Sequence, residues 1–395
     1  MIPLEFKFAG TRCGLKNKRN DLGIIFSERP ALAAGVLTTN QVQAACVGHT
    51  RSVLESGQLR AVVVNSGNAN CCTGAQGLRD TAAMAEITAG LLEIASSDVA
   101  VGSTGVIGHL LDMAKVERGI HQAVKVLGSD PAPFMDAILT TDLVEKWAAT
   151  DLAGSALLTP TNPAGELGSG RIYGVAKGSG MMAPNMATML SYIVTDLDAS
   201  GLDLKAILRR AADKSFNAMT VDGDTSTNDM LLVLANGASG IKVSEADFDQ
   251  RLTEICVSLA KQIARDGEGA TKLLEVKVTG TDDPKTVART IANSPLVKTA
   301  MFGCDPNWGR VLMAAGKSGV TFNPALARLA LNIGEETHLL FEEGAPAAFD
   351  PKRVSTALKS DHVVIDLHLG EGDTATIYSC DFGYGYVRIN AEYHT

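Results

Sequence analysis

The chain has 395 residues, of which 46% are hydrophobic and 5% aromatic, and its net charge is −9 at pH 7. This length exceeds one simple core and predicts two or three domains. The acidic balance argues against a nucleic-acid partner, which usually requires a basic face. No apolar run approaches the ~20 residues of a membrane span, and no secretory signal is visible, so we expect a cytoplasmic protein.

The first half of the chain alternates apolar runs with helical periodicity. Apolar runs bounded by turn residues predict strands, and apolar residues three or four positions apart predict helices. The predicted strands are 22–26, 33–40, 59–65, 99–101, 172–176 and 189–194. The predicted helices are 79–95 and 117–139, and 145–170 has the composition of a hairpin or surface excursion.

The second half continues this alternation and then changes character. A helix is expected from about Asp203 to 212, and a longer one from 248 to Arg265, where glycines end it. A strand follows at 273–278, and the turn at 280–284 is a plausible domain boundary. The remainder alternates short helices (286–292, 310–315) with strands (363–369, 375–380) and predicts a smaller α+β unit.

Seven cysteines are present, and their spacings match no zinc pattern. We interpret them as reduced, mostly buried thiols of a reducing compartment. The acidic segment 220–229 is rich in oxygen ligands but does not fit a calcium loop, which needs a Glu at its twelfth position. We therefore assign no metal and no cofactor.

The stretch 177–190, KGSGMMAPNMATML, is the centre of the chain's organisation. It contains no His, Cys or carboxylate, so no His-based triad can be built from it alone. A lone Thr is a poor nucleophile without a neighbouring base. Thr188 could use its own α-amino group as that base only if the chain cleaved itself between Ala187 and Thr188. By composition alone the stretch also fits a Gly-rich loop that leads into a buried strand.

Two further segments carry groups suited to acyl chemistry. Thr104 and Gly105 follow a strand and can offer a hydroxyl and an unobstructed N–H to a developing oxyanion, although an ordinary turn has the same pattern. Glu268 lies between two glycines and can face a ligand cation, although a solvated loop Glu is commoner. A Ser-His-Asp elbow, a phosphate loop, a dinucleotide fingerprint and a zinc-protease helix are not found.

These motifs, in order along nearly the whole chain, resemble the ornithine acetyltransferase family, also called bifunctional glutamate N-acetyltransferase. The resemblance rests on 103–108, 140–142, 177–190, 220–229, 266–272, 304–310 and the C-terminal 387–395. It implies an α/β fold, a four-layer α/β/β/α sandwich with a smaller C-terminal α+β domain. It also implies self-cleavage into an α chain, 1–187, and a β chain, 188–395. Residues 188–280 would complete the sandwich, and 281–395 would form the C-terminal domain.

By the same resemblance, Thr188 is the nucleophile, and Thr104 and Gly105 form the oxyanion hole. The substrate-binding positions that the resemblance implies are Thr140 or Thr141, Lys177, Thr188, Glu268, Asn390 and Thr395. The implied reaction moves an acetyl group from N-acetylornithine to glutamate, and the implied assembly is α2β2. Whether acetyl-CoA is a second donor stays open. The alternatives are an aminopeptidase or amidase of related fold and a binding protein that never cleaves.

Overall fold

The computed structural model describes residues 2–154, 156–182 and 189–392, and its strands form two sheets. The first sheet has eight strands, with the order β4-β3-β2-β8-β7-β6-β5 and with β1 paired to β2. These strands are β1 (Phe6–Thr11), β2 (Leu22–Leu37), β3 (Gln58–Asn68), β4 (Val99–Val106), β5 (Lys146–Asp151), β6 (Arg171–Lys177), β7 (Leu190–Thr195) and β8 (Met230–Ala235). In space, β7 and β8 therefore lie between β2 and β6, which precede them in the chain.

The long strand β2 belongs to both halves of this sheet. Its residues 22–26 pair with β3, and its residues 32–37 pair with β8. The register shifts between Phe26 and Ala31, where Glu28, Arg29 and Pro30 are exposed. The sequence predicted separate strands at 22–26 and 33–40, but the polar segment between them continues the same strand.

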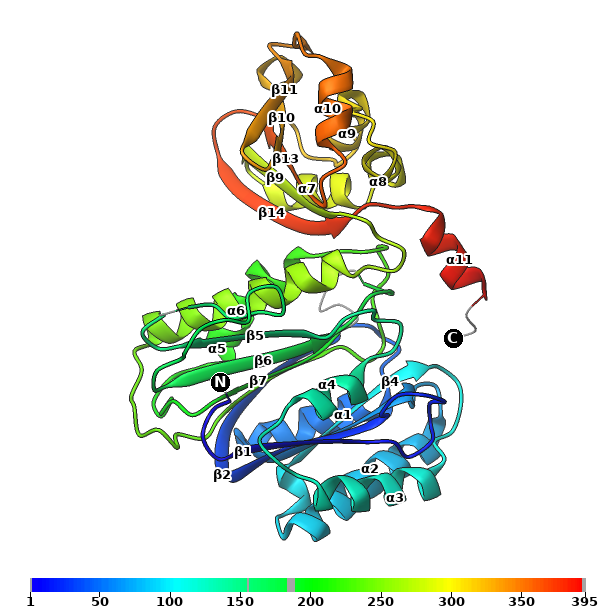
Figure 1. Ribbon diagram of the computed structural model, residues 1–395, viewed down its shortest axis with the longest axis vertical. Helices are drawn as coiled ribbons and strands as arrows, with labels where there is room; N and C mark the ends of the chain where they lie inside the picture. Colours follow the sequence, from blue (N-terminus) through cyan, green and yellow to red (C-terminus); the bar gives the residue numbers. More distant parts are fainter. Residues whose placement is uncertain (1, 155, 183–188, 393–395) are drawn as a thin grey trace.

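The two halves of the first sheet face each other, and helices cover their outer faces (Figure 1). One core lies between the halves and includes Phe8, Val62, Tyr173, Tyr192 and Leu232. The helices of this part are α1 (Ala45–Val53), α2 (Gly74–Leu92), α3 (Met113–Lys125), α4 (Ala132–Ile138), α5 (Leu204–Lys214) and α6 (Glu245–Arg265). The expected four-layer α/β/β/α sandwich is thereby confirmed.

Separate cores lie under each helical layer. Helices α1, α2 and α3 pack on the half with β3 and β4, and α5 and α6 pack on the other half. Strand β7 shows the consequence for sequence: Tyr192 and Val194 enter the inner core, whereas Ile193 enters the core under α5 and α6. Because both faces of such a strand are buried, its sequence is a continuous apolar run.

The C-terminal unit is built on the second sheet, with the order β12-β11-β10-β13-β9-β14. Its strands are β9 (Leu273–Thr281), β10 (Arg328–Ile333), β11 (Glu336–Glu342), β12 (Ala345–Pro346), β13 (His362–His368) and β14 (Asp373–Cys380). Its helices are α7 (Pro284–Ala292), α8 (Pro295–Phe302), α9 (Trp308–Gly316), α10 (Pro351–Ala357) and α11 (Tyr384–Glu392). Since β9 pairs with β13 and β14, this sheet begins at Leu273, before the expected boundary at 280/281.

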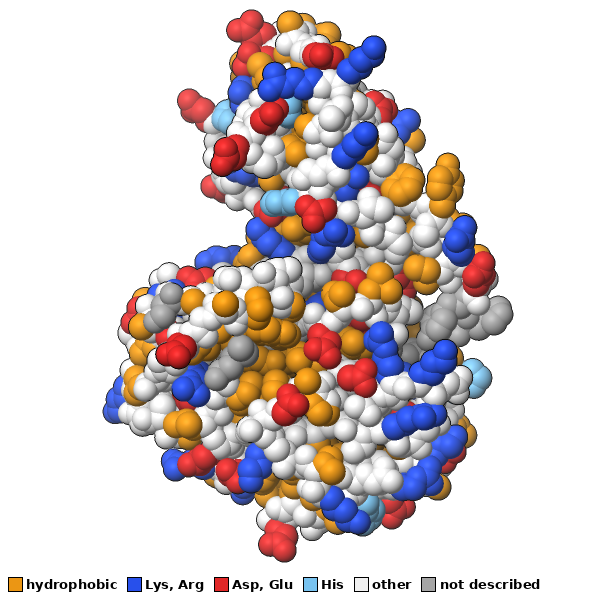
Figure 2. All heavy atoms as spheres, viewed as in Figure 1, with side chains coloured by type: hydrophobic (Ala, Val, Ile, Leu, Met, Phe, Trp, Pro, Cys, Tyr) orange, Lys and Arg blue, Asp and Glu red, His pale blue; other side chains and the backbone are white. Residues whose placement is uncertain are grey.

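Helix α11 leaves the C-terminal unit and comes down beside the sandwich (Figure 1). Figure 2 shows a deep notch between the C-terminal unit and the sandwich on the opposite side of the molecule. The predicted helix 117–139 is two helices, α3 and α4, because the segment between them ends in Pro131, which cannot continue a helix. Within the described ranges, no helix is long and apolar enough to cross a membrane.

Candidate active site

A small cavity of about 120 Å³ collects residues from seven separate segments of the chain. The expected site residues that line it are Thr104, Gly105, Thr140, Thr141, Lys177, Glu268 and Asn390. Its other lining residues are Ala69, Ile107, Gly180, Met181, Ser226, Thr227 and Asn228. A larger groove of about 1160 Å³ lies along β2 between α1 and α5, but none of the expected residues lines it.

Three expected residues lie outside the described part of the chain: Ala187, Thr188 and Thr395. The two described residues that flank 183–188 are Met182 and Met189. Met189 is directly followed by β7, so the chain enters the sheet at Leu190, two residues after Thr188.

Lys177 ends β6, and its side chain is 4% exposed. Its Nζ donates a hydrogen bond of 3.2 Å to Thr104 Oγ1, at the end of β4. Because an ammonium group only donates, the Thr104 oxygen is the acceptor, and its own hydroxyl hydrogen remains to be donated. Burial lowers the pKa of Lys177, and the negative charges of Asp142, Asp229 and Glu268 oppose that shift.

Gly105 follows in a backbone conformation that requires glycine. Its φ is +129°, and a Cβ there would come within 2.4 Å of the carbonyl carbon of Gly67 on β3. Strands β3 and β4 pair in parallel, and their register shifts at this point. The chain thus brings Thr104 and Gly105 to the cavity at an irregularity of the sheet edge, where a side chain at 105 would not fit.

Asn228 holds the strand ends around this position. Its Nδ2 donates to the carbonyl oxygens of Ser103 (2.8 Å) and Ala69 (2.7 Å), and its own Oδ1 accepts from the Thr227 hydroxyl (2.6 Å). One carboxamide therefore connects the residue before Thr104 to the chain after β3. Asn228 is 6% exposed, so these bonds are largely shielded from water.

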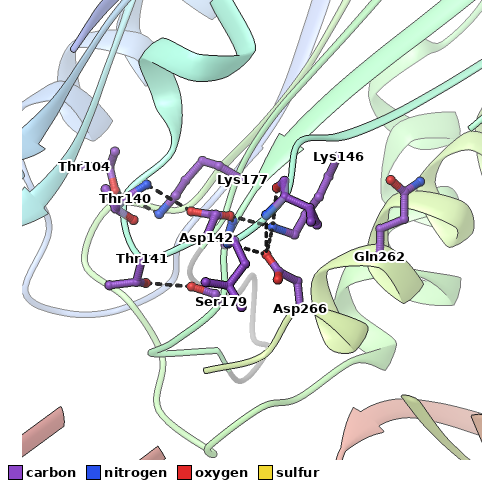
Figure 3. A network of polar contacts seen from close by, with 12 residues as sticks. Thr104, Thr140, Thr141, Asp142, Lys146, Lys177, Ser179, Gln262 and Asp266 are labelled. Atoms are coloured by element: carbon purple, nitrogen blue, oxygen red, sulfur yellow. Dashed lines mark hydrogen bonds and ion pairs between the residues drawn. The ribbon is translucent and has the colours of Figure 1, made fainter. Parts of the chain in front are cut away.

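A buried ionic triad, Asp142–Lys146–Asp266, supports the other side of the cavity (Figure 3). Lys146 Nζ lies 2.7 Å from Asp142 Oδ1 and 2.6 Å from Asp266 Oδ2. Asp142 also accepts the N–H groups of Thr140 (3.0 Å) and Gly178 (2.7 Å). Burial opposes ionisation of Asp142, but the charges of Lys146 and Lys177 hold its pKa well below the usual range.

Thr140 and Thr141, the two candidates that the sequence left open, both line the cavity. The Thr141 hydroxyl lies 2.6 Å from the Ser179 hydroxyl, a contact that fixes the loop to the segment after β6 (Figure 3). Glu268 N–H donates to Ser179 O at 2.8 Å, which brings the Glu268 segment to the same place.

The Glu268 carboxylate lies where the sandwich meets α11. Its Oε2 accepts a 2.7 Å hydrogen bond from Asn390 Nδ2. A Cβ on Gly180 would come within 2.4 Å of the Glu268 carboxyl carbon, so a larger residue at 180 would displace the end of the Glu268 side chain from its present position. The structure thus brings Glu268 and Asn390 into direct contact.

Sequence reasoning did not single out Lys146, Asn228 or the contacts of the segment 220–229. Asp222 accepts the N–H groups of Met181 (2.6 Å) and Met182 (2.7 Å), and Asp229 accepts that of Met189 (3.0 Å). Burial raises the pKa of Asp229 well above its usual value. The acidic character of 220–229 was a visible signal, but nothing local indicated what these carboxylates contact. Among the residues that the structure describes, no group of three His, Cys, Asp or Glu is placed to hold a metal ion.

Comparison with known proteins identifies close relatives. The sequence model of the ArgJ family matches residues 7–395. The arginine biosynthesis bifunctional protein ArgJ of Shouchella clausii is 46% identical, over 99% of this chain and 94% of that protein. The protein of the same name from Symbiobacterium thermophilum is 46% identical, over 100% of this chain and 98% of that protein.

Solved structures give a similar result. The ornithine acetyltransferase of Mycobacterium tuberculosis, complexed with ornithine, is 40% identical with a TM-score of 0.40, and the match covers 46% of this chain and 92% of that chain. The arginine biosynthesis bifunctional protein of Bacillus halodurans is 42% identical with a TM-score of 0.40, over 47% of this chain and 92% of that chain.

Proposed function

The chain belongs to the ArgJ family and is an acetyltransferase of arginine biosynthesis, and we propose that Thr188, exposed by self-cleavage, is its nucleophile. The observation that carries this proposal is the cavity itself. It gathers Thr104 and Gly105, a buried lysine, a carboxylate and two threonine hydroxyls from distant segments. Strand β7 begins at Leu190, two residues after Thr188.

Maturation proceeds in two steps, an acyl shift from nitrogen to oxygen and hydrolysis of the ester that it forms. Thr188 Oγ attacks the Ala187 carbonyl carbon, the C–N bond breaks, and the hydroxyl proton moves to the Thr188 nitrogen. Water then hydrolyses the resulting ester, which leaves a carboxylate on Ala187 and restores the Thr188 hydroxyl. The products are an α chain, 1–187, and a β chain, 188–395. A free α-amine has a pKa of about 7.7–8.0, so a substantial fraction is neutral near pH 7 and can act as a base.

Acetyl transfer then follows a ping-pong course. Thr188 Oγ attacks the acetyl carbonyl of N-acetylornithine, and the α-amine returns the proton to the departing ornithine nitrogen. The amino group of glutamate attacks the acetyl ester, and N-acetylglutamate leaves. Thr104 and Gly105 stabilise the oxyanion of both tetrahedral intermediates, where such donors are often the largest catalytic contribution. The contact between Lys177 and Thr104 places a buried positive charge beside them.

The remaining substrate contacts are assigned by charge. Glu268 binds a substrate ammonium, and Asn390 orients that carboxylate. Lys177 binds a substrate carboxylate, with Thr140 or Thr141 and the C-terminal Thr395 completing the site. The complex of the Mycobacterium tuberculosis relative with ornithine supports an ornithine-bearing donor.

The enzyme uses no cofactor in this proposal. The name "bifunctional" in its relatives supports acetyl-CoA as a second acetyl donor, and therefore as a substrate. We also propose an α2β2 assembly and a cytoplasmic location.

A related-fold aminopeptidase or amidase is not favoured, because the matched relatives are proteins of arginine biosynthesis. The two activities differ in the acceptor. With N-acetylornithine as donor, the transferase makes N-acetylglutamate only when glutamate is present, whereas a hydrolase releases acetate without it.

The nucleophile is tested by replacing Thr188 and measuring intact mass and N-terminal sequence. We expect wild-type protein to give two chains, the second of which begins at Thr188. Thr188→Ala should remain a single inactive chain, and Thr188→Ser, which keeps a hydroxyl, should still split. Splitting of the Thr188→Ala chain would refute the mechanism.

A further inference from the structure

The segment Thr220–Met230 contacts the chain on both sides of 183–188, and each contact fixes a main-chain group. On the upstream side, Asp222 accepts the N–H of Met182, while Val221 N–H (2.6 Å) and the Thr220 hydroxyl (3.2 Å) donate to the Met182 carbonyl. On the downstream side, Asp229 accepts the N–H of Met189, and Met230 N–H donates to the Met189 carbonyl at 2.9 Å. One continuous segment therefore holds Met182 and Met189 at both their donors and their acceptors.

The upstream contact also enforces an unusual backbone. The two oxygens of Asp222 accept two consecutive N–H groups, those of Met181 and Met182, at 2.6 and 2.7 Å. Met181 has φ +56°, a left-handed conformation that a non-glycine residue rarely adopts. Such strain persists where surrounding contacts fix it, and it concentrates at functional sites.

The downstream contact is buried and incompletely paired. Asp229 is 1% exposed, and in the described part of the chain its Oδ2 has no hydrogen-bond partner. Burying a carboxyl group with an oxygen that lacks a hydrogen-bond partner costs free energy, so an Asp at this position indicates a role beyond packing. Met189 N is covalently bonded to the carbonyl carbon of Thr188, so Asp229 Oδ1 lies one hydrogen bond and one covalent bond from the expected nucleophilic residue.

We propose that Thr220–Met230 is a clamp for self-cleavage, in which Asp222 and Asp229 are positioning residues that fix the two ends of the segment containing the scissile bond. This inference rests on the proposed cleavage between Ala187 and Thr188. For self-cleavage, the Thr188 hydroxyl must reach the carbonyl carbon of the preceding residue in one particular geometry. Fixing both ends of the segment reduces the number of other backbone conformations that it can adopt, and so favours that geometry.

The two carboxylates have different roles after cleavage. Asp229 holds the end that carries Thr188, so it continues to orient the nucleophile during turnover. Asp222 holds the other end, which no longer bears a reacting group. Loss of Asp222 should therefore slow maturation more than it slows acetyl transfer, whereas loss of Asp229 should slow both.

The test follows the rate at which newly synthesised full-length chain converts to two chains, by pulse labelling and gel electrophoresis. Asp222→Asn removes the charge but keeps the shape, and we expect cleavage to slow by about 10- to 100-fold, the effect of weakening charge-assisted hydrogen bonds. Asp224→Asn is the matched control: Asp224 is exposed in the same segment, and its main-chain N–H, which the substitution keeps, donates to Asp222 Oδ1 at 3.2 Å. It should cleave at the wild-type rate.

A second measurement separates positioning from a folding defect. Circular dichroism and gel filtration identify the folded fraction of each variant, and kcat is measured per mole of cleaved enzyme. For Asp222→Asn we expect kcat within about threefold of wild type, and for Asp229→Asn a loss of at least tenfold. Cleavage of folded Asp222→Asn at the wild-type rate would refute the clamp, and so would equal loss of kcat in both variants. If the wild-type chain itself never splits, the proposed function fails instead.

Discussion

Replacing Lys146 with Met tests whether the buried triad supports the cavity. The substitution removes the hydrogen bonds from Lys146 Nζ to Asp142 (2.7 Å) and Asp266 (2.6 Å). It leaves these two carboxylates without the lysine between them, in a site where the side chains of Lys146 and Asp142 are fully buried. Asp142 keeps the charge of Lys177 but loses its closest ion-pair partner. Breaking a buried ion pair by removing one member costs about 3–5 kcal/mol.

The assay is urea unfolding at fixed protein concentration, repeated between pH 7 and pH 3. The folded pKa of Asp142 is depressed, so its contribution to stability is present above about pH 4, the unfolded value, and is lost as pH falls through the folded pKa. In the Lys146→Met variant the pKa of Asp142 rises toward its usual range. The difference in free energy of unfolding between wild type and variant should therefore be largest at pH 7 and should shrink toward pH 3.

The matched control is Lys7→Met, which removes the half-exposed pair between Lys7 and Glu28. An exposed pair contributes about 0–1 kcal/mol. The role of the triad would be contradicted if Lys146→Met lowered the free energy of unfolding no more than Lys7→Met does. It would also be contradicted if the loss of stability in Lys146→Met did not change with pH.

Three further predictions follow from single contacts. Thr104→Val removes a proposed oxyanion donor, and kcat should fall about 10²–10³-fold when it is measured per mole of folded, cleaved enzyme. A change in KM alone would count against that role. Gly180→Ala pushes a methyl group against the Glu268 carboxyl carbon, so KM for acetylornithine should rise, whereas Gly48→Ala, which meets nothing within 4 Å, should leave KM unaltered. Burial raises the pKa of Asp229, so the folded protein retains a proton on this carboxyl group that the unfolded chain releases. The free energy of unfolding therefore falls as pH rises from about 4 through the folded pKa of Asp229. Asp229→Asn should make the free energy of unfolding depend less on pH, and an unchanged pH dependence would contradict this assignment to Asp229.

The sequence predicted β2, β3, β4, β6 and β7 of the sandwich but not β1, β5 or β8, and it named seven of the residues that line the cavity. Strands β3 and β7 are buried on both faces, so their apolar runs are visible in the sequence, whereas the equally buried run of β8 was not singled out. Asp203 was visible as a helix start, and its side chain accepts the Ala206 N–H as a helix N-cap does. The expected residues that line the cavity could be named because each lies in a motif that is contiguous in the chain.

What the sequence could not supply are contacts between distant segments. Lys146 and Asp266 are 120 residues apart, and neither position has a local pattern that indicates an ion pair. The turn at 280–284 suggested a boundary after β9, but β9 pairs with β13, which begins at His362. That parallel pairing is decided by packing of the whole C-terminal unit, so composition near residue 280 carries no signal of it.

The strand order of the first sheet has a consequence for how the protein must be made. Strands β7 and β8 follow residue 188 in the chain, yet they are inserted between β6 and β2, which precede it, with six paired positions on each side. Two polypeptides produced by a break at 187/188 would therefore contribute alternating strands to one sheet, and neither could dissociate without breaking the strand pairing. Synthesised separately, each would present open strand edges that favour aggregation. If the chain is cut at 187/188 as proposed, folding of the uncut precursor therefore has to come before cutting.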